Sequence, residues 1–155
     1  MKNILIIFIV ITFLFSMSCN KCGGKATVVD TGVEITYVNN KGEDLLNVAT
    51  PGHFSADSIH IYNVVKGIKK EVYNSHYDIP RNFVIIKNDS LHKYFLRIFP
   101  DVDTTLLELN ENTTDTITCE FAKSYCNNQI VTKVWYNGIL KWGDMSVPRA
   151  FTIIK

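Results

Sequence analysis

The stretch VTKVWYNGILKW, residues 131–142, carries the clearest fold signal in the chain. Two apolar runs, 131–136 and 139–142, flank the dipeptide Asn137-Gly138. Asn-Gly favours a type I′ turn, because both central residues of that turn need a positive φ angle. We therefore predict a tight β-hairpin. In its register Tyr136 faces Ile139, Trp135 faces Leu140 and Lys133 faces Trp142, and we expect Val131, Trp135 and Leu140 to point into the core.

Alternation of apolar and polar residues, the pattern of a half-buried strand, recurs through the rest of the chain. Residues 83–86 are apolar on both faces, which predicts a central strand, and they precede a partner at 93–99 in a hairpin. About seven to nine strands with turns between them predict an all-β fold, an antiparallel two-sheet sandwich of immunoglobulin-like type. A closed barrel is the alternative. The other expected strands lie at residues 33–37, 58–62, 105–109, 116–121 and 150–154.

Residues 1–18 have the composition of an export signal. An apolar run at 4–15 follows the basic residue Lys2, and its twelve residues are fewer than a membrane-spanning helix needs, which is about 18–20. The small residue Ser18 then precedes Cys19, as in a lipobox, although Ser16 stands where Leu is commonest. We predict a lipoprotein signal peptide over 1–18 and lipidation of Cys19, with an ordinary secretory signal as the alternative.

The charge of the chain gives no basis for nucleic-acid binding. Loss of residues 1–18 removes one basic residue, Lys2, and leaves fifteen basic and fifteen acidic residues. A formally neutral domain has no overall attraction for nucleic acid or for lipid headgroups, so we expect lipid alone to hold it at a membrane. Residues 19–26, with paired glycines, predict a flexible tether from the acylated Cys19, and 27–155 predict a single β-sandwich domain.

Four segments carry a family resemblance: ITYVNNKGEDLL (35–46), SIHIY (58–62), EVYN (71–74) and KVWYNG (133–138). Together they resemble the small uncharacterised lipoproteins of Bacteroides-type bacteria. These motifs are strands and turns, so the resemblance implies a lipoprotein and a sandwich, and no activity. Some lipoproteins of this kind carry an acidic run after the acylated cysteine that directs them to the cell exterior, and Asn20-Lys21 lacks it. The resemblance implies an outer-membrane lipoprotein facing the periplasm, with the cell surface as the alternative.

The cysteines suggest one disulfide. Cys119 lies in line with Ile117 and Phe121, and a tight hairpin around Ala122-Lys123 would bring Cys126 opposite it. An exported domain permits such a bond between Cys119 and Cys126, and two separate thiols are the alternative.

No pattern in the sequence points to a metal, a cofactor or a catalytic residue. The chain lacks a G-x-S-x-G element, a glycine-rich phosphate loop and an H-E-x-x-H motif. Asp101-Val102-Asp103 lacks the glycine and the glutamate of an EF-hand loop. We therefore expect no metal site, no cofactor and no enzyme activity. The four histidines, His53, His60, His76 and His92, are scattered and are expected on the surface.

Aromatic residues at strand ends and loops offer one ligand hypothesis. Exposed flat rings stack on sugar faces, although core packing accounts for most aromatics in a small β domain. The leading prediction is a non-catalytic, lipid-anchored envelope module with a structural or protein-interaction role. The alternative is an accessory carbohydrate- or small-ligand-binding lipoprotein, and an enzyme is least favoured. The candidate stacking residues are Tyr62, Tyr73, Tyr77 and Trp142.

Overall fold

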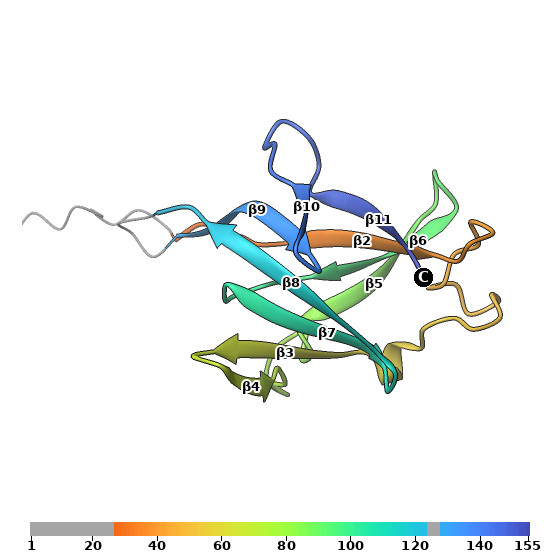
Figure 1. Cartoon of the computed structure of the whole chain (residues 1–155), viewed down its shortest axis with the longest axis horizontal. Coiled ribbons are helices and arrows are strands. Elements are labelled where there is room, and N and C mark those ends of the chain that lie inside the picture. The colour runs from red at the N-terminus through yellow and green to blue at the C-terminus, as the bar shows by residue number, and fades with distance from the viewer. Residues whose placement is uncertain (1–26, 124–127) are drawn as a thin grey trace, which may run out of the picture.

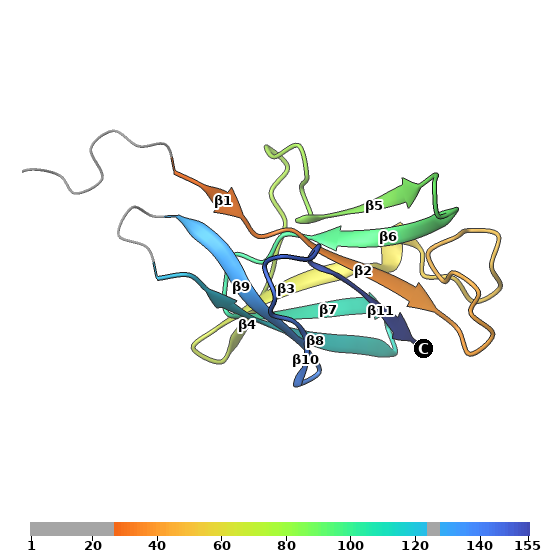
Figure 2. The same ribbon diagram turned by 90° about the horizontal axis from the view of Figure 1, so that it is seen from above.

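The computed structural model describes residues 27–123 and 128–155, which form two packed β-sheets (Figures 1 and 2). One sheet has the order β1-β9-β8-β7-β3-β4, with β10 also paired to β9, and the other has the order β11-β2-β6-β5. This confirms the predicted all-β sandwich. The elements are β1 (Val29–Asp30), β2 (Val33–Val38), the 3-10 turn η1 (Ala56–Ser58), β3 (His60–Val65), β4 (Ile68–Glu71), β5 (Phe83–Asn88), β6 (Lys93–Ile98), β7 (Thr104–Asn110), β8 (Thr113–Phe121), β9 (Gln129–Tyr136), β10 (Ile139–Trp142) and β11 (Ala150–Ile154).

The sheets are mixed rather than purely antiparallel. β1 runs parallel to β9, and β11 runs parallel to β2. Each parallel pair joins strands that lie far apart in the sequence, so no hairpin fixes their direction. Two of the eleven described strands, β1 and β4, were not predicted. β1 has only two residues, and all four residues of β4 are exposed, so neither carries an alternating pattern.

The core lies between the two sheets and is built by inward side chains of most strands. Val33, Ile35 and Tyr37 of β2 are fully buried, as are Leu96 of β6 and Leu107 of β7. Burial of each such aliphatic side chain stabilises the fold by about 1.5–3 kcal/mol. Within the described residues, no helix is long and apolar enough to cross a membrane.

The predicted hairpin forms, but a bulge changes its end. Asn137 and Gly138 both have positive φ, and Ile139 pairs with Tyr136 and Leu140 with Trp135, as predicted. Trp142 pairs with Val134 rather than with Lys133, because the register shifts between Leu140 and Trp142.

A second bulge, in the pairing of β8 with β9, reverses the face of β9. Phe121 pairs with Val131 and Glu120 with Lys133, so Thr132 is an extra residue on β9. After an extra residue the alternation of inward and outward side chains changes parity. Val131 is buried as predicted, whereas the prediction that Trp135 and Leu140 point inward is wrong. Val134 and Tyr136 occupy the core instead, and Leu140 is exposed.

The prediction of a central strand at 83–86 is also wrong. β5 pairs with β6 in the expected hairpin but has no partner on its other side, so it is an edge strand. Phe83 and Ile85 pack against the core, and all residues from Phe83 to Ile86 are half-buried. An apolar run of this length fits either a central strand or an edge strand whose outer face is partly covered.

Candidate functional site

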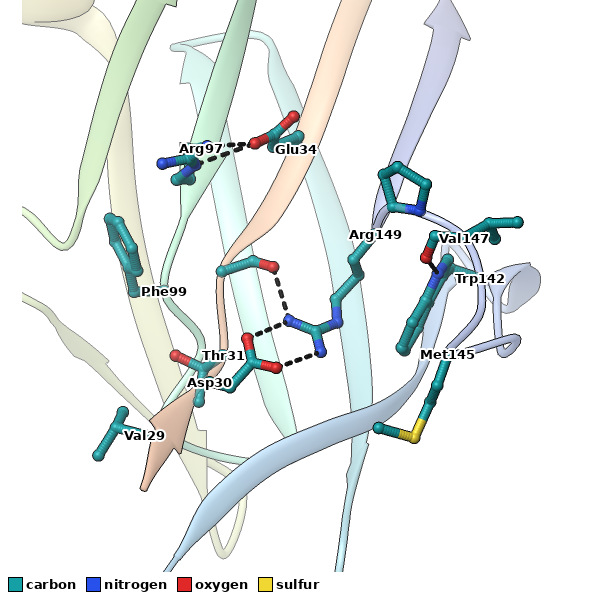
Figure 3. A pocket seen from close by; sticks show the side chains of 12 residues that line it. Val29, Asp30, Thr31, Glu34, Arg97, Phe99, Trp142, Met145, Val147 and Arg149 are labelled. Carbon is teal, nitrogen blue, oxygen red and sulfur yellow. Dashed lines mark hydrogen bonds and ion pairs between the residues drawn. The ribbon is translucent and has the colours of Figure 1, made fainter. Parts of the chain in front are cut away.

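A cleft of about 490 Å³ opens beside β1, between the start of β2, the end of β6 and the loop that joins β10 to β11 (Figure 3). Its floor carries Arg149, from that loop, and Asp30, from β1. The sequence places these two residues 119 positions apart. The crossing of the chain from one sheet to the other brings them together.

Arg149 binds one side-chain carboxylate and two backbone carbonyl groups. Its side chain is only 9% exposed, and its guanidinium donates to both carboxylate oxygens of Asp30, at 3.0 and 3.3 Å. It also donates to the carbonyl oxygens of Gly32, at 2.8 Å, and Val131, at 3.0 Å. Such bidentate, charge-assisted bonds are among the stronger hydrogen bonds in proteins. The bond from Arg149 lowers the pKa of the Asp30 carboxyl from its usual value.

A second ion pair stands at the rim of the cleft. Arg97 of β6 donates to Glu34 of β2 through Nε and a terminal nitrogen, and the Nε contact to Oε1 is 3.1 Å. Both side chains are partly exposed, at 39% and 29%. Since each arginine is paired with a carboxylate, the charges of the cleft largely compensate one another.

Trp142 forms a wall of this cleft and is not an exposed stacking platform. It is 6% exposed, its Nε1 donates to the Val147 carbonyl at 3.1 Å, and the Arg149 guanidinium lies 4.6 Å from the ring centroid. The prediction that Trp142 stacks on a ligand is therefore wrong, because the bulge before it turns the ring inward. The rim beside it is apolar and exposed, with Met145 at 65% and Val147 at 49%.

Two further hollows continue from the cleft, one after the other. One of about 500 Å³ shares Val29, Thr31 and Phe99 with it. The other, of about 220 Å³, shares Tyr77 and Asp101 with the 500 Å³ hollow. We call the three together the end groove. It passes from the β10–β11 loop, across β1, to the loop between β4 and β5.

Two of the predicted stacking residues lie exposed in the end groove. Tyr73 and Tyr77 are 65% and 67% exposed and line the same 220 Å³ hollow. Asn63 lies beside them and donates to Asp101 at 2.8 Å, while its own carbonyl oxygen is buried without a partner among the described residues. Aromatic rings beside an amide and a carboxylate are a chemistry suited to polar ligands.

Tyr62 lies outside this hollow and is partly covered. The Lys69 ammonium stands 3.6 Å from the centroid of its ring, and the His60 ring packs beside it at 6.4 Å. The cation therefore occupies one face of the ring that a ligand would use. The structure brings together Tyr73 and Tyr77, and it separates them from Tyr62 and Trp142.

Cys119 lies in the core, 4% exposed, and forms no disulfide with another described residue. Burial raises the pKa of its thiol to about 12. The residue that pairs with Cys119 is Val134, so the tight turn predicted at Ala122-Lys123 does not form. Cys126 lies outside the described residues, and the disulfide stays a prediction. The signal peptide, Cys19 and the tether over 19–26 also lie outside them.

A buried charged cluster lies at the far end of the molecule. Asp115 is 3% exposed and accepts hydrogen bonds from Lys155 Nζ at 2.6 and 2.7 Å, from Asn137 at 2.8 Å and from the Tyr136 hydroxyl. Burial holds the pKa of Tyr136 well above its usual range, so its hydroxyl stays a donor. All groups of the cluster are satisfied, which indicates a structural role.

No sequence pattern marks the charged residues of the cleft as a site. Glu34 and Arg97 stand at outward positions of alternating strands, and nothing in the sequence shows which strands are neighbours. No group of three or more His, Cys, Asp or Glu suited to a metal ion occurs among the described residues. No known protein family, curated protein or solved structure matches this chain.

Proposed function

We propose that this protein is a lipid-anchored component of the cell envelope, acylated at Cys19, whose sandwich acts by binding another envelope protein rather than by catalysis. The observation that carries the proposal is the end groove. Its arginines are paired with Asp30 and Glu34, so these charges fix the shape of the cleft. The exposed apolar side chains of Val29, Met145 and Val147 form much of the rim, as in surfaces that bind a partner.

The position of the groove fits an anchored protein. β1 lines the groove and is the first described strand, so it follows directly on the predicted tether. The eight residues from 19 to 26 span at most about 30 Å at ~3.3–3.6 Å per residue. A partner in the groove would therefore be bound close to the membrane, and we propose the periplasmic face of the outer membrane.

Mass spectrometry of the mature N-terminus tests the anchor. We expect Cys19 to be the first residue and to carry two or three acyl chains. The variant Cys19→Ala is expected to leave the membrane fraction as a folded, soluble protein, because no other strong membrane attachment is predicted. An unmodified Cys19 in protein isolated from its own membranes overturns the assignment.

Site-specific photo-crosslinking in living cells tests the groove. A photoreactive residue replaces Met145, which is 65% exposed at the rim of the cleft, and in a matched control it replaces Leu91, which is 68% exposed and outside the groove. We expect one discrete adduct from position 145 that disappears in the Cys19→Ala background. The same adducts from both positions would show that the groove is not the binding site.

A second candidate function is supported by Tyr73 and Tyr77. The two exposed rings and the adjacent Asn63 and Asp101 are suited to a glycan, with stacking on the rings and hydrogen bonds to the polar groups. Titration of soluble glycans should show binding that weakens at least about fivefold in Tyr73→Ala and in Tyr77→Ala, as for an aromatic anchor residue. Leu91→Ala is the control. Unchanged affinity in both tyrosine variants excludes this glycan site.

A further inference from the structure

The turn between β3 and β4 carries an exposed apolar pair. Val65 and Ile68 are directly opposite each other in the hairpin and are 52% and 71% exposed. Lys66 and Gly67 form the turn between them, both with positive φ. A cross-strand pair projects from one face of a hairpin, so these two side chains form one small apolar surface.

Lysines surround this pair. The segment 65–70, VKGIKK, holds three lysines and no acidic residue. Lys69 lies 3.6 Å from Glu108 and over the Tyr62 ring. Lys66 and Lys70 are exposed and form no ion pair with another described residue. Two carboxylates lie beside these lysines: Glu108, which pairs with Lys69, and Glu71, which pairs with His60. Lys66 and Lys70 still leave a local excess of positive charge in a formally neutral domain, and we call residues 65–70 the basic tip.

The basic tip lies at the end of the molecule where β1 begins. Both views show the β3–β4 turn and the start of β1 at the same end of the long axis, with the β5–β6 turn at the opposite end (Figures 1 and 2). Val28 and Val29 are also exposed there, at 49% and 65%. Since Val28 lies two residues after the predicted tether, this end is the one that a lipid on Cys19 would hold nearest the bilayer.

We propose that the basic tip docks on the surface of an anionic phospholipid bilayer. Val65 and Ile68 enter the headgroup region, and Lys66 and Lys70 stand among the phosphates, an arrangement like that of other interfacial membrane contacts. The inference rests on the proposed lipid anchor, which supplies the membrane affinity. The tip adds orientation: a domain held at a second point no longer rotates freely on its tether. Because Lys70 also lines the 220 Å³ hollow, docking places that end of the end groove beside the bilayer.

Hydrogen exchange of the mature acylated protein in nanodiscs tests this docking. Exchange at residues 63–71 is compared between phosphatidylglycerol and phosphatidylcholine discs, with residues 88–92 at the opposite end as the internal control. We expect slower exchange of the tip on the anionic discs only, and no difference at 88–92. Val65→Ser with Ile68→Ser should abolish the protection, and both sites are exposed, so the fold tolerates the changes.

Charge variants provide the matched comparison. Removal of one lysine near an anionic surface should lower the ratio of docked to undocked domains about fivefold, so Lys66→Gln and Lys70→Gln should each reduce the protection by that factor. Lys41→Gln removes a lysine that is also exposed, in the turn after β2 at the opposite end, and should change nothing. Equal exchange of the tip on both kinds of disc, with Cys19 shown to be acylated, overturns the docking alone. An unmodified Cys19 in the native protein overturns the anchor itself.

Discussion

At the scale of single residues, Arg149 supplies a hydrogen bond at the edge of β9 that a neighbouring strand would otherwise supply. β1 covers one part of the edge of β9, through Gln129 and Ile130, and β10 covers another, from Val134 to Tyr136. Between them the carbonyl oxygen of Val131 accepts a hydrogen bond from Arg149 rather than from a backbone amide. A side chain thus closes the edge of the sheet where two short strands leave a gap.

The two arginines of the cleft should differ in their contribution to stability. Arg149→Met removes four hydrogen bonds from a buried guanidinium and should lower the free energy of unfolding by about 2–3 kcal/mol. Arg97→Met breaks a partly exposed pair and should lower it by less than about 1 kcal/mol. Urea denaturation of the two variants measures both values. Equal losses would show that the buried contacts of Arg149 add nothing beyond a surface ion pair.

Asp30 should make the stability of the protein depend on pH in the acid range. Its folded pKa is lowered by Arg149 from the ordinary value of 3.8, so its contribution to stability is complete above that value and is lost as the pH falls through the folded pKa. The difference in Tm between wild type and Asp30→Asn should therefore be constant from about pH 5 to 7 and shrink below about pH 4. A difference that persists undiminished at pH 2 would contradict the role of the Asp30 charge.

At the scale of elements, the β9–β10 turn should depend on Gly138. This residue has φ of +79°, where a Cβ atom meets the following carbonyl, although no other atom lies near enough to clash. Gly138→Ala should therefore destabilise the protein by about 1–2 kcal/mol through backbone strain alone. Gly143→Ala is the matched control: a Cβ there makes ordinary contacts at 3.6 Å or more, and thermal unfolding should show little change.

The Asn137-Gly138 turn could be predicted from local residues, whereas the turn predicted at Ala122-Lys123 does not form. The faces of the strands could be predicted only in part. Asn137 and Gly138 mark their turn because few other residues adopt positive φ. Nothing in the sequence marks Thr132 and Lys141 as bulge positions. Each is an extra residue in its strand, and the alternation of inward and outward side chains is reversed after it. The inward position of Trp142 follows from such a bulge. The site is harder still to predict from the sequence, because the pairing of Arg149 with Asp30 depends on β1, a parallel strand of two residues that has no sequence pattern.

At the scale of the whole molecule, Asp115 and Lys155 link the two sheets. Asp115 lies on β8 in one sheet, while Lys155 follows β11 in the other and bonds through its amide to Val38 of β2. Lys155→Met leaves the buried Asp115 carboxylate without its cation and should lower the free energy of unfolding by about 3 kcal/mol. Asp115→Asn with Lys155→Met removes both charges and should recover part of that loss, as measured by urea denaturation.

Comparison of Asp115→Asn, Lys155→Met and the double variant shows whether the contributions of Asp115 and Lys155 to stability depend on each other. If the two residues interact, the double variant is more stable than the sum of the single losses predicts, because no unpaired charge stays buried. Lys141→Met, at an exposed lysine of β10, gives the effect of charge removal alone. Strict additivity would mean that Lys155 contributes packing and not charge.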